Sequence, residues 1–290
     1  MPESAAMNVS PSALPADTSS SAASGIRIPP QPQVLIDLVE LLGSDDYDAR
    51  RTAAVIGQDA GLSAMIFKAV RSPAFGGSRA PDSLDQAIVR IGFRQTLNIA
   101  RAVALSTAID ADRRRAYELF WTRSRELAQL AALIAEERVS VCNIFPDQAY
   151  MAGVFFECGV PVLMQRFPDY CEALLLDDRL DMPSLRDEDL RFNVDHSSIG
   201  YLVARHWGLP DFIAQAILHH EDVPRGELGA VRSLVAILHL ASHARLHALH
   251  IHDYNWERTG DEVLGELGLH PDDLGGYLAD LGERFLPLKL

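Results

Sequence analysis

Apolar residues recur every three or four positions along most of the chain, and this spacing constrains the fold more than any other feature. Leu35, Leu38 and Leu42, for example, share one face of a helix that Gly43 would end. No run of Val, Ile and Thr alternates with polar residues over the length of a strand. The sequence therefore predicts an all-α protein.

The helical segments group into two lobes. Residues 26–112 are expected to form an N-terminal helical lobe and residues 113–285 a second helical lobe, whereas residues 1–25, rich in Ala, Ser and Pro, are expected to be a flexible tail. Helices are expected at 34–42, 48–58, 60–71, 84–91, 93–109, 114–138, 147–157, 160–177, 183–191, 195–206, 210–221, 229–251, 261–267 and 271–285.

The charge of the chain excludes several kinds of partner. Lys and Arg total 26 against 40 Asp and Glu, for a net charge of −14, so we expect no nucleic-acid partner. The acidic excess lies after residue 110, and we expect a small anionic ligand to meet the first lobe instead. No apolar run is long enough for membrane insertion. Three cysteines without CxxC spacing and the lack of a signal-peptide pattern predict a cytoplasmic protein.

All ten histidines lie after residue 195, and eight of them form two groups. The first group holds His196, His206, His219 and His220, with Asp195 beside the first of them. Such residues can ligate zinc, iron or manganese, but they can equally cap helices or bond to core carbonyl groups.

The second group is a stripe on one predicted helix. It comprises His239, His243, His247 and His250. At about 100° per residue the four fall on one arc, away from the apolar face, so we expect the stripe to face water. A transition-metal site there is the alternative.

The sequence lacks the familiar catalytic signatures. It contains no GxGxxG, GxxxxGK[ST], GxSxG or HExxH motif. Function must therefore be argued from weaker motifs and from their order.

The order of several short motifs resembles the HDOD family, the HD-related output domains of bacterial signalling proteins. The resemblance spans residues 26–285, and its pieces in the second lobe include Phe120–Ser124, Ala152–Gly159, Asp195–Gly200 and Trp207–Pro210. In the first lobe they include Ile28–Pro32, Asp59–Leu62, Arg71–Gly76 and Ser83–Ile88. Arg71 departs from the family, which commonly carries Asn there. The resemblance implies that the second lobe is HD-domain-like.

The family is related to HD-type metal-dependent phosphohydrolases, which place His, a His–Asp pair, further His residues and a late Asp around one or two metals. The resemblance assigns these positions here to Arg123, Phe156, Glu157, His196, His219, His220 and Ser242. Phe156 cannot ligate a metal, and Arg123 keeps its positive charge at any working pH. We therefore expect a degenerate site without metal or other cofactor, closed by an Arg123–Glu157 ion pair.

The resemblance implies a non-catalytic module of bacterial signal transduction, and we expect a stand-alone copy because no other signalling domain is recognisable in the sequence. It would act in trans through contacts with other signalling proteins, with a link to cyclic-dinucleotide or related regulation. Two alternatives remain open. One is an HD-type phosphohydrolase using Glu157, His196, His219 and His220, and the other is a receptor that holds a small nucleotide between the lobes with arginines such as Arg71, Arg94 or Arg101.

Overall fold

A computed structural model describes residues 33–44, 47–72, 75, 81–104, 113–176, 181, 183–224 and 229–288. The proposed tail at 1–25 lies outside these residues. The first lobe contains α1 (Gln33–Gly43), α2 (Ala49–Ile56), α3 (Ala60–Ala69), α4 (Leu84–Ile91) and α5 (Phe93–Ala104).

The second lobe begins with a long central helix. Its elements are α6 (Arg114–Cys142), α7 (Pro146–Phe155), α8 (Gly159–Arg166), α9 (Tyr170–Ala173), α10 (Leu185–Phe192), α11 (His196–His206), α12 (Asp211–Leu218), α13 (Gly229–Ala248), α14 (Tyr254–Leu267), the 3₁₀ turn η3 (Pro271–Asp273), α15 (Leu274–Phe285) and the 3₁₀ turn η4 (Leu286–Leu288). Every described element is a helix, which confirms the all-α prediction.

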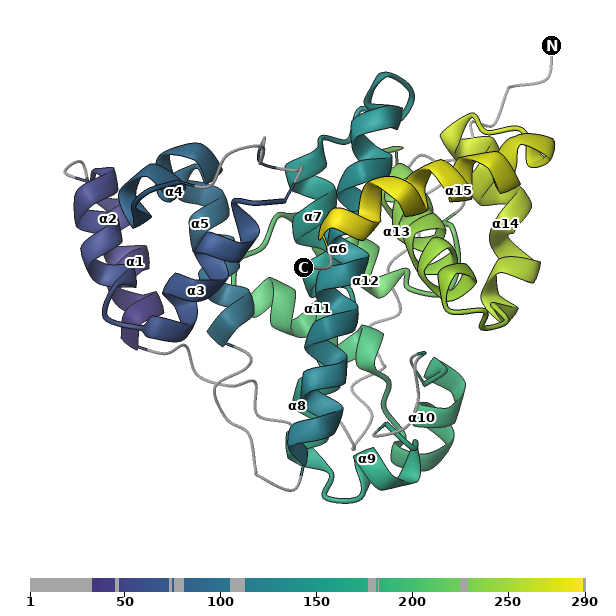
Figure 1. The fold of residues 1–290 in the computed structure, drawn as a ribbon. Helices are drawn as coiled ribbons and strands as arrows, with labels where there is room; N and C mark the ends of the chain where they lie inside the picture. Colours follow the sequence, from purple (N-terminus) through teal and green to yellow (C-terminus); the bar gives the residue numbers. More distant parts are fainter. Residues whose placement is uncertain are drawn as a thin grey trace, which may run out of the picture.

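The helix α6 forms the axis of the second lobe, with α7 and α13 packed along it (Figure 1). Every residue from Leu127 to Ala135 is buried, including the polar Gln129, because neighbouring helices cover this part of α6 on all sides. The helix runs four residues past the predicted end and stops at Asn143, whose left-handed backbone caps it.

Local capping explains why several helices begin where the sequence predicts. The side chains of Asp59 and Asp195 accept hydrogen bonds from backbone N–H groups in the first turns of α3 and α11. Ser83 and Gln86 have the spacing of a capping box, but none forms, since the Ser83 side chain makes no cap bond and Gln86 instead accepts from the backbone N–H of Asp82.

The segment predicted as one helix at 160–177 is two helices. The chain leaves α8 at Phe167, which has an extended backbone, and re-enters a short α9. Phe167 packs its ring against Phe192 of α10, so a tertiary contact stabilises the break.

The helix α5 of the first lobe packs on α7 of the second lobe, and side-chain hydrogen bonds from α5 join the two lobes. Gln95 donates to Asp147 at the start of α7 over 2.6 Å, and Arg101 donates to the carbonyl of Gly208 over 3.1 Å. None of the helices within the described ranges is both long and apolar enough to cross a membrane.

Candidate functional site

A buried glutamate organises the histidine cluster of the second lobe. Glu188 of α10 is fully buried, and its carboxylate accepts two hydrogen bonds from His196, from the backbone N–H at 2.8 Å and from ring Nδ1 at 2.7 Å. The hydroxyl of Tyr170 donates to the other carboxylate oxygen. Charge and hydrogen bonding from Glu188 outweigh the burial that disfavours an imidazolium, and they raise the pKa of His196.

The close approach of α8 and α11 fixes the position of His196. A Cβ on Gly159 would lie 2.0 Å from the backbone oxygen of His196, so only glycine fits there. The Ala152–Gly159 motif therefore has a packing role in placing the first turn of α11.

His220 lies on the other side of His196 and completes the cluster. The Nε2 atoms of the two rings are 3.5 Å apart, and the His220 ring stacks on Phe156 with centroids 4.0 Å apart. Burial, followed by the nearby charges of His196 and His239, holds the pKa of His220 well below its ordinary value. The raised pKa of His196 and the lowered pKa of His220 are both consistent with a protonated His196 that donates a hydrogen bond to a neutral His220.

Arg123 and Glu157 lie near this cluster but do not form the predicted ion pair. Arg123 is buried and donates to the backbone carbonyl of Asp181 over 2.8 Å. Glu157 is partly exposed, and its Oε2 has no hydrogen-bond partner within the described part of the chain. Desolvation raises the pKa of Glu157, while the charge of Arg123 acts against the rise. Arg123 and Glu157 therefore attract each other electrostatically without a direct salt bridge.

The remaining candidate residues sit at the edge of the cluster. His219 is the half-buried residue that ends α12, and its backbone N–H bonds to Gln215. Ser242 is half-buried on α13, and among the described residues no hydrogen bond joins its side chain to the cluster. The structure therefore brings together Arg123, Phe156, Glu157, His196 and His220, and leaves His219 and Ser242 peripheral.

The prediction that the second histidine group faces water is wrong for two of its four members. His239 is buried and its Nε2 lies 2.7 Å from the backbone oxygen of His220, and burial lowers its pKa. His243 stacks on Trp256 at 4.0 Å and bonds to Asp253 at 3.1 Å. Since α12 and α14 pack on α13, the face opposite its apolar arc is also covered.

The other two histidines of this group agree with the prediction. His247 is exposed near the end of α13, and His250 is exposed beyond it, with a left-handed backbone. The four histidines therefore do not form a single stripe.

The donor set does not fit a metal ion of the HD type. Phe156 supplies no ligand atom at its position, and the buried Arg123 brings a fixed positive charge that acts on Glu157. Within the described ranges, no group of three or more His, Cys, Asp or Glu side chains is arranged to hold a metal. The arrangement is that of a hydrogen-bonded core around a buried carboxylate.

Sequence reasoning missed Glu188, Tyr170 and the burial of His239. Glu188 lies in the charged stretch Leu185–Phe192, which looks solvent-exposed in sequence. The available signal was Asn193, which ends α10 two residues before the Asp195 cap and so turns α10 back toward α11.

The fold is all-helical, and the cluster is a hydrogen-bonded group of histidines around the buried Glu188. The family model for the HDOD domain matches residues 28–223. The chain therefore belongs to the HDOD family, as its motifs predicted.

Solved structures with the same fold come from several bacteria. An HDOD domain protein of unknown function from Geobacter sulfurreducens is 22% identical, with a TM-score of 0.63 over 93% of this chain and 94% of its own. A candidate metal-dependent phosphohydrolase from Shewanella amazonensis is 18% identical, with a TM-score of 0.65 over 92% and 93%. A candidate signal transduction protein from Marinobacter aquaeolei is 21% identical, with a TM-score of 0.63 over 92% and 62%.

A curated relative of this chain is a longer protein. An uncharacterised protein of Treponema pallidum is 22% identical over 198 residues, which are 68% of this chain and 38% of the relative. The chain thus spans well under half the length of that relative. Both the family match and the structural likeness place α1–α12 in the shared fold, and the structural likeness extends it toward the C-terminus.

Proposed function

We propose that this protein is a non-catalytic signalling module that acts through contacts with other signalling proteins in trans. The observation that carries the proposal is the use of the imidazoles inside the core. His196 bonds to Glu188 and His220, and His239 bonds to the backbone of His220. These bonds stabilise the fold, and because a carboxylate-bound imidazole can also support a metal, the buried positive charge of Arg123 beside the cluster is what opposes coordination.

Membership of the HDOD family supports a signalling role. The Marinobacter protein with the same fold carries a signal-transduction name, and the resemblance described above implies the same class of function. A link with cyclic-dinucleotide or related regulation, and a location in the cytoplasm, belong to the proposal as consequences of that resemblance.

The second candidate function is metal-dependent phosphohydrolysis. One observation favours it. Glu157 Oε2 has no hydrogen-bond partner in the described chain, and the charge of this carboxylate acts on His196. Against it stand the buried guanidinium of Arg123 and the ring of Phe156 at the positions of metal ligands. A cation beside a buried arginine is repelled in a low-dielectric interior.

The metal content of untagged protein tests the choice between these functions. We expect less than about 0.1 equivalents of iron, manganese or zinc by plasma mass spectrometry, and no hydrolysis of bis-p-nitrophenyl phosphate with any of these metals added. About one equivalent that disappears in His196→Ala would establish the phosphohydrolase instead.

A variant with the ligand types returned makes this test sharper. Arg123→His, Phe156→His and Glu157→Asp together restore the residue types that the HD relatives use at those positions. We expect the triple variant to take up metal where the parent does not, because each replacement adds a donor or removes a repelling charge. Equal metal content in both proteins would contradict the degenerate-site argument.

The protein-contact part of the proposal has its own test. We expect affinity capture from the native cell extract to retain the same partner in the presence and absence of EDTA. Arg123→Ala removes a buried bond to the backbone of Asp181, and we expect it to weaken capture only as far as it disturbs the fold. Loss of the partner on chelation would show that contact depends on a metal, contrary to the proposal.

A further inference from the structure

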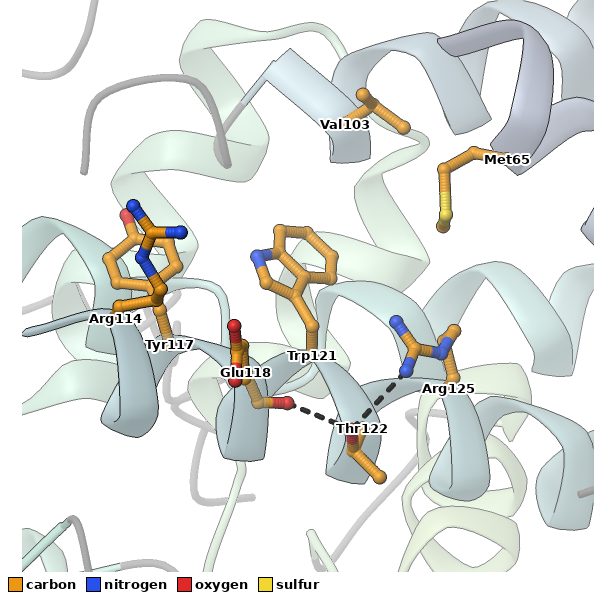
Figure 2. Close-up of a pocket in the computed structure, with 8 residues that line it drawn as sticks. All are labelled: Met65, Val103, Arg114, Tyr117, Glu118, Trp121, Thr122 and Arg125. Carbon is orange, nitrogen blue, oxygen red and sulfur yellow. Dashed lines mark hydrogen bonds between the residues drawn. The ribbon is translucent and has the colours of Figure 1, made fainter. Parts of the chain in front are cut away.

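A second site lies between the lobes, where α3 and α5 meet the first turns of α6. It is a cavity of about 520 Å³, within the size range of small-molecule pockets. Its walls are formed by Met65, Val103, Arg114, Tyr117, Glu118, Trp121, Thr122 and Arg125. Figure 2 shows the Trp121 ring standing at the centre, with Arg114 on one side and Arg125 on the other.

This cavity is separate from the histidine cluster. Arg123 and Arg125 are two residues apart on α6, which places them about 200° apart around the helix axis. Arg123 is buried on the side of the cluster, and Arg125 lines the cavity. A ligand in the cavity would therefore not touch His196 or Glu188.

The two arginines of the cavity have no acidic partner. Arg125 donates to the hydroxyl of Thr122 over 3.2 Å, and neither Arg114 nor Arg125 forms a salt bridge with any carboxylate that the structure describes. Other arginines of the second lobe do pair with carboxylates, for example Arg232 with Glu266 and Arg245 with Glu126. Arg114 and Arg125 are therefore not neutralised by a carboxylate that the structure describes, and their charge can act on an external anion.

Two further cations lie next to the cavity. Lys68 is one turn beyond Met65 on α3, and Arg71 follows the end of that helix. Desolvation, followed by the positive charges of Arg125 and Arg71, lowers the pKa of Lys68. The like charges are therefore close enough to repel one another, and a bound anion would relieve that repulsion.

The cavity also offers an aromatic surface and a hydrogen-bond donor. Phe120 packs edge-on against Trp121 with centroids 5.1 Å apart and so fixes the indole ring. The Trp121 Nε1 atom is buried and has no hydrogen-bond partner in the described chain, although buried indole N–H groups usually find one. A planar ring can stack on Trp121 while its acceptor atoms approach this N–H group.

We propose that this cavity binds a nucleotide whose phosphate groups meet Arg114 and Arg125 on either side of Trp121 and whose base lies against the Trp121 ring. Arginine is suited to phosphate because its planar fork matches the phosphate oxygens. The carboxylate of Glu118 in the wall opposes a simple anion and suits the amino or imino donors of a base. The inference goes beyond the proposed function and does not depend on it.

The structure separates the arginines that the sequence suggested for such a ligand. Arg71 lies next to the cavity, whereas Arg101 is engaged with Asn98 and Gly208. Arg94 is exposed nine residues before Val103 on α5, about 13 Å away along the helix. Arg94 is therefore a control, because it is an exposed arginine of the first lobe that lies outside the site.

The test is isothermal titration of the full chain with AMP, GMP, cyclic di-AMP, cyclic di-GMP and inorganic phosphate. We expect at least one nucleotide to bind with a Kd below about 100 μM, and at least a tenfold weaker Kd in Arg114→Ala and Arg125→Ala with no change in Arg94→Ala. Inorganic phosphate should bind at least tenfold more weakly than that nucleotide, because it cannot stack on Trp121.

An NMR measurement places the ligand without relying on the arginine variants. The chain has three tryptophans, and Trp121→Phe assigns the Trp121 indole N–H signal, which we expect to move most when the nucleotide binds. Three results would overturn the proposal. They are no binding by any of the probes at 1 mM, binding that both arginine variants retain, and a nucleotide that leaves the Trp121 signal unmoved. None of them bears on metal content, so this failure is distinct from that of the proposed function.

Discussion

The histidine cluster and the cavity between the lobes lie on opposite sides of α6. The charged groups of the cluster are bonded to one another inside the protein, whereas those of the cavity are not. In the cluster, Glu188 is fully buried and each of its oxygens accepts from a protein group. In the cavity, Arg114 and Arg125 face a space of about 520 Å³ and lack a described carboxylate partner.

The difference separates residues that hold the fold from residues available to a ligand. A buried charge without a partner is costly, so a charge paired inside the core is committed to stability. A charge left beside open space costs little to the fold and can bind an external group. Resemblance to HD enzymes directs attention to the histidines, yet the unpaired groups on the other side of α6 are the ones free to bind.

The largest expected effect is at Glu188. Glu188→Gln removes the negative charge that His196 and Tyr170 contact, and we expect the free energy of unfolding to fall by about 3–5 kcal/mol because a buried imidazolium loses its partner. Urea denaturation measures the change. Glu172→Gln, on the exposed surface of α9, is the control and should change stability by less than about 0.5 kcal/mol. A small effect at Glu188 would mean that His196 is neutral and the cluster loosely held.

The contact between the lobes should show an intermediate effect. Arg101 donates to Asn98 and to the carbonyl of Gly208, a glycine that the turn requires because its φ is +68°. Arg101→Met removes both bonds, and we expect about 2 kcal/mol of lost stability in thermal or urea denaturation. Arg94→Met on the same helix should be close to neutral. Equal losses in the two variants would show that the bonds across the lobes contribute little.

Acid should destabilise the cluster by a smaller amount. His220 and His239 have lowered pKa values in the folded state, so their contribution is present above the unfolded value of 6.5 and is lost as the pH falls below it. The raised pKa of His196 acts oppositely, adding stability below 6.5 that is lost as the pH rises through its folded value.

The two histidines with lowered pKa values outweigh His196, whose pKa is raised. The free energy of unfolding should therefore fall by about 1–2 kcal/mol as the pH falls from 6.5 to 5.5. The variant His239→Gln keeps a donor near the carbonyl of His220 but does not titrate, and it should reduce the fall by about half. Urea denaturation at the two pH values measures both. A stability that is flat over this range would contradict the lowered pKa values.

The smallest effect on stability is expected in the cavity. Arg125→Ala removes one bond to Thr122 and also a charge that acts on Lys68, so we expect a change within about 0.5 kcal/mol of zero in urea denaturation. A loss of 2 kcal/mol or more would place Arg125 with the structural charges of the cluster and would remove the contrast between the two regions.

Helix positions were largely predictable because they follow from local rules. The caps at Asp59 and Asp195 and the apolar spacing of α1 and α3 locate these elements without knowledge of the rest of the chain. The break between α8 and α9 was missed because it depends on Phe167 meeting Phe192, which is 25 positions further along.

The site was predictable in its members more than in its contacts. Motif order brought Arg123, Phe156, Glu157, His196 and His220 into one site, and the structure places them together. The proposed Arg123–Glu157 pair failed because Arg123 is bonded to the backbone of Asp181, a loop residue that no local pattern connects to α6.

The sequence by itself determined an all-helical chain of the HDOD family, because periodicity and motif order are local properties. Only the tertiary structure decided which charges are enclosed. Glu188 lies in a highly charged helix and yet is fully buried at the middle of the histidine cluster. His239 is covered by α12 and α14, and Arg114 and Arg125 line an open cavity. Burial depends on what packs against a residue from distant parts of the chain, and no window of sequence contains that information.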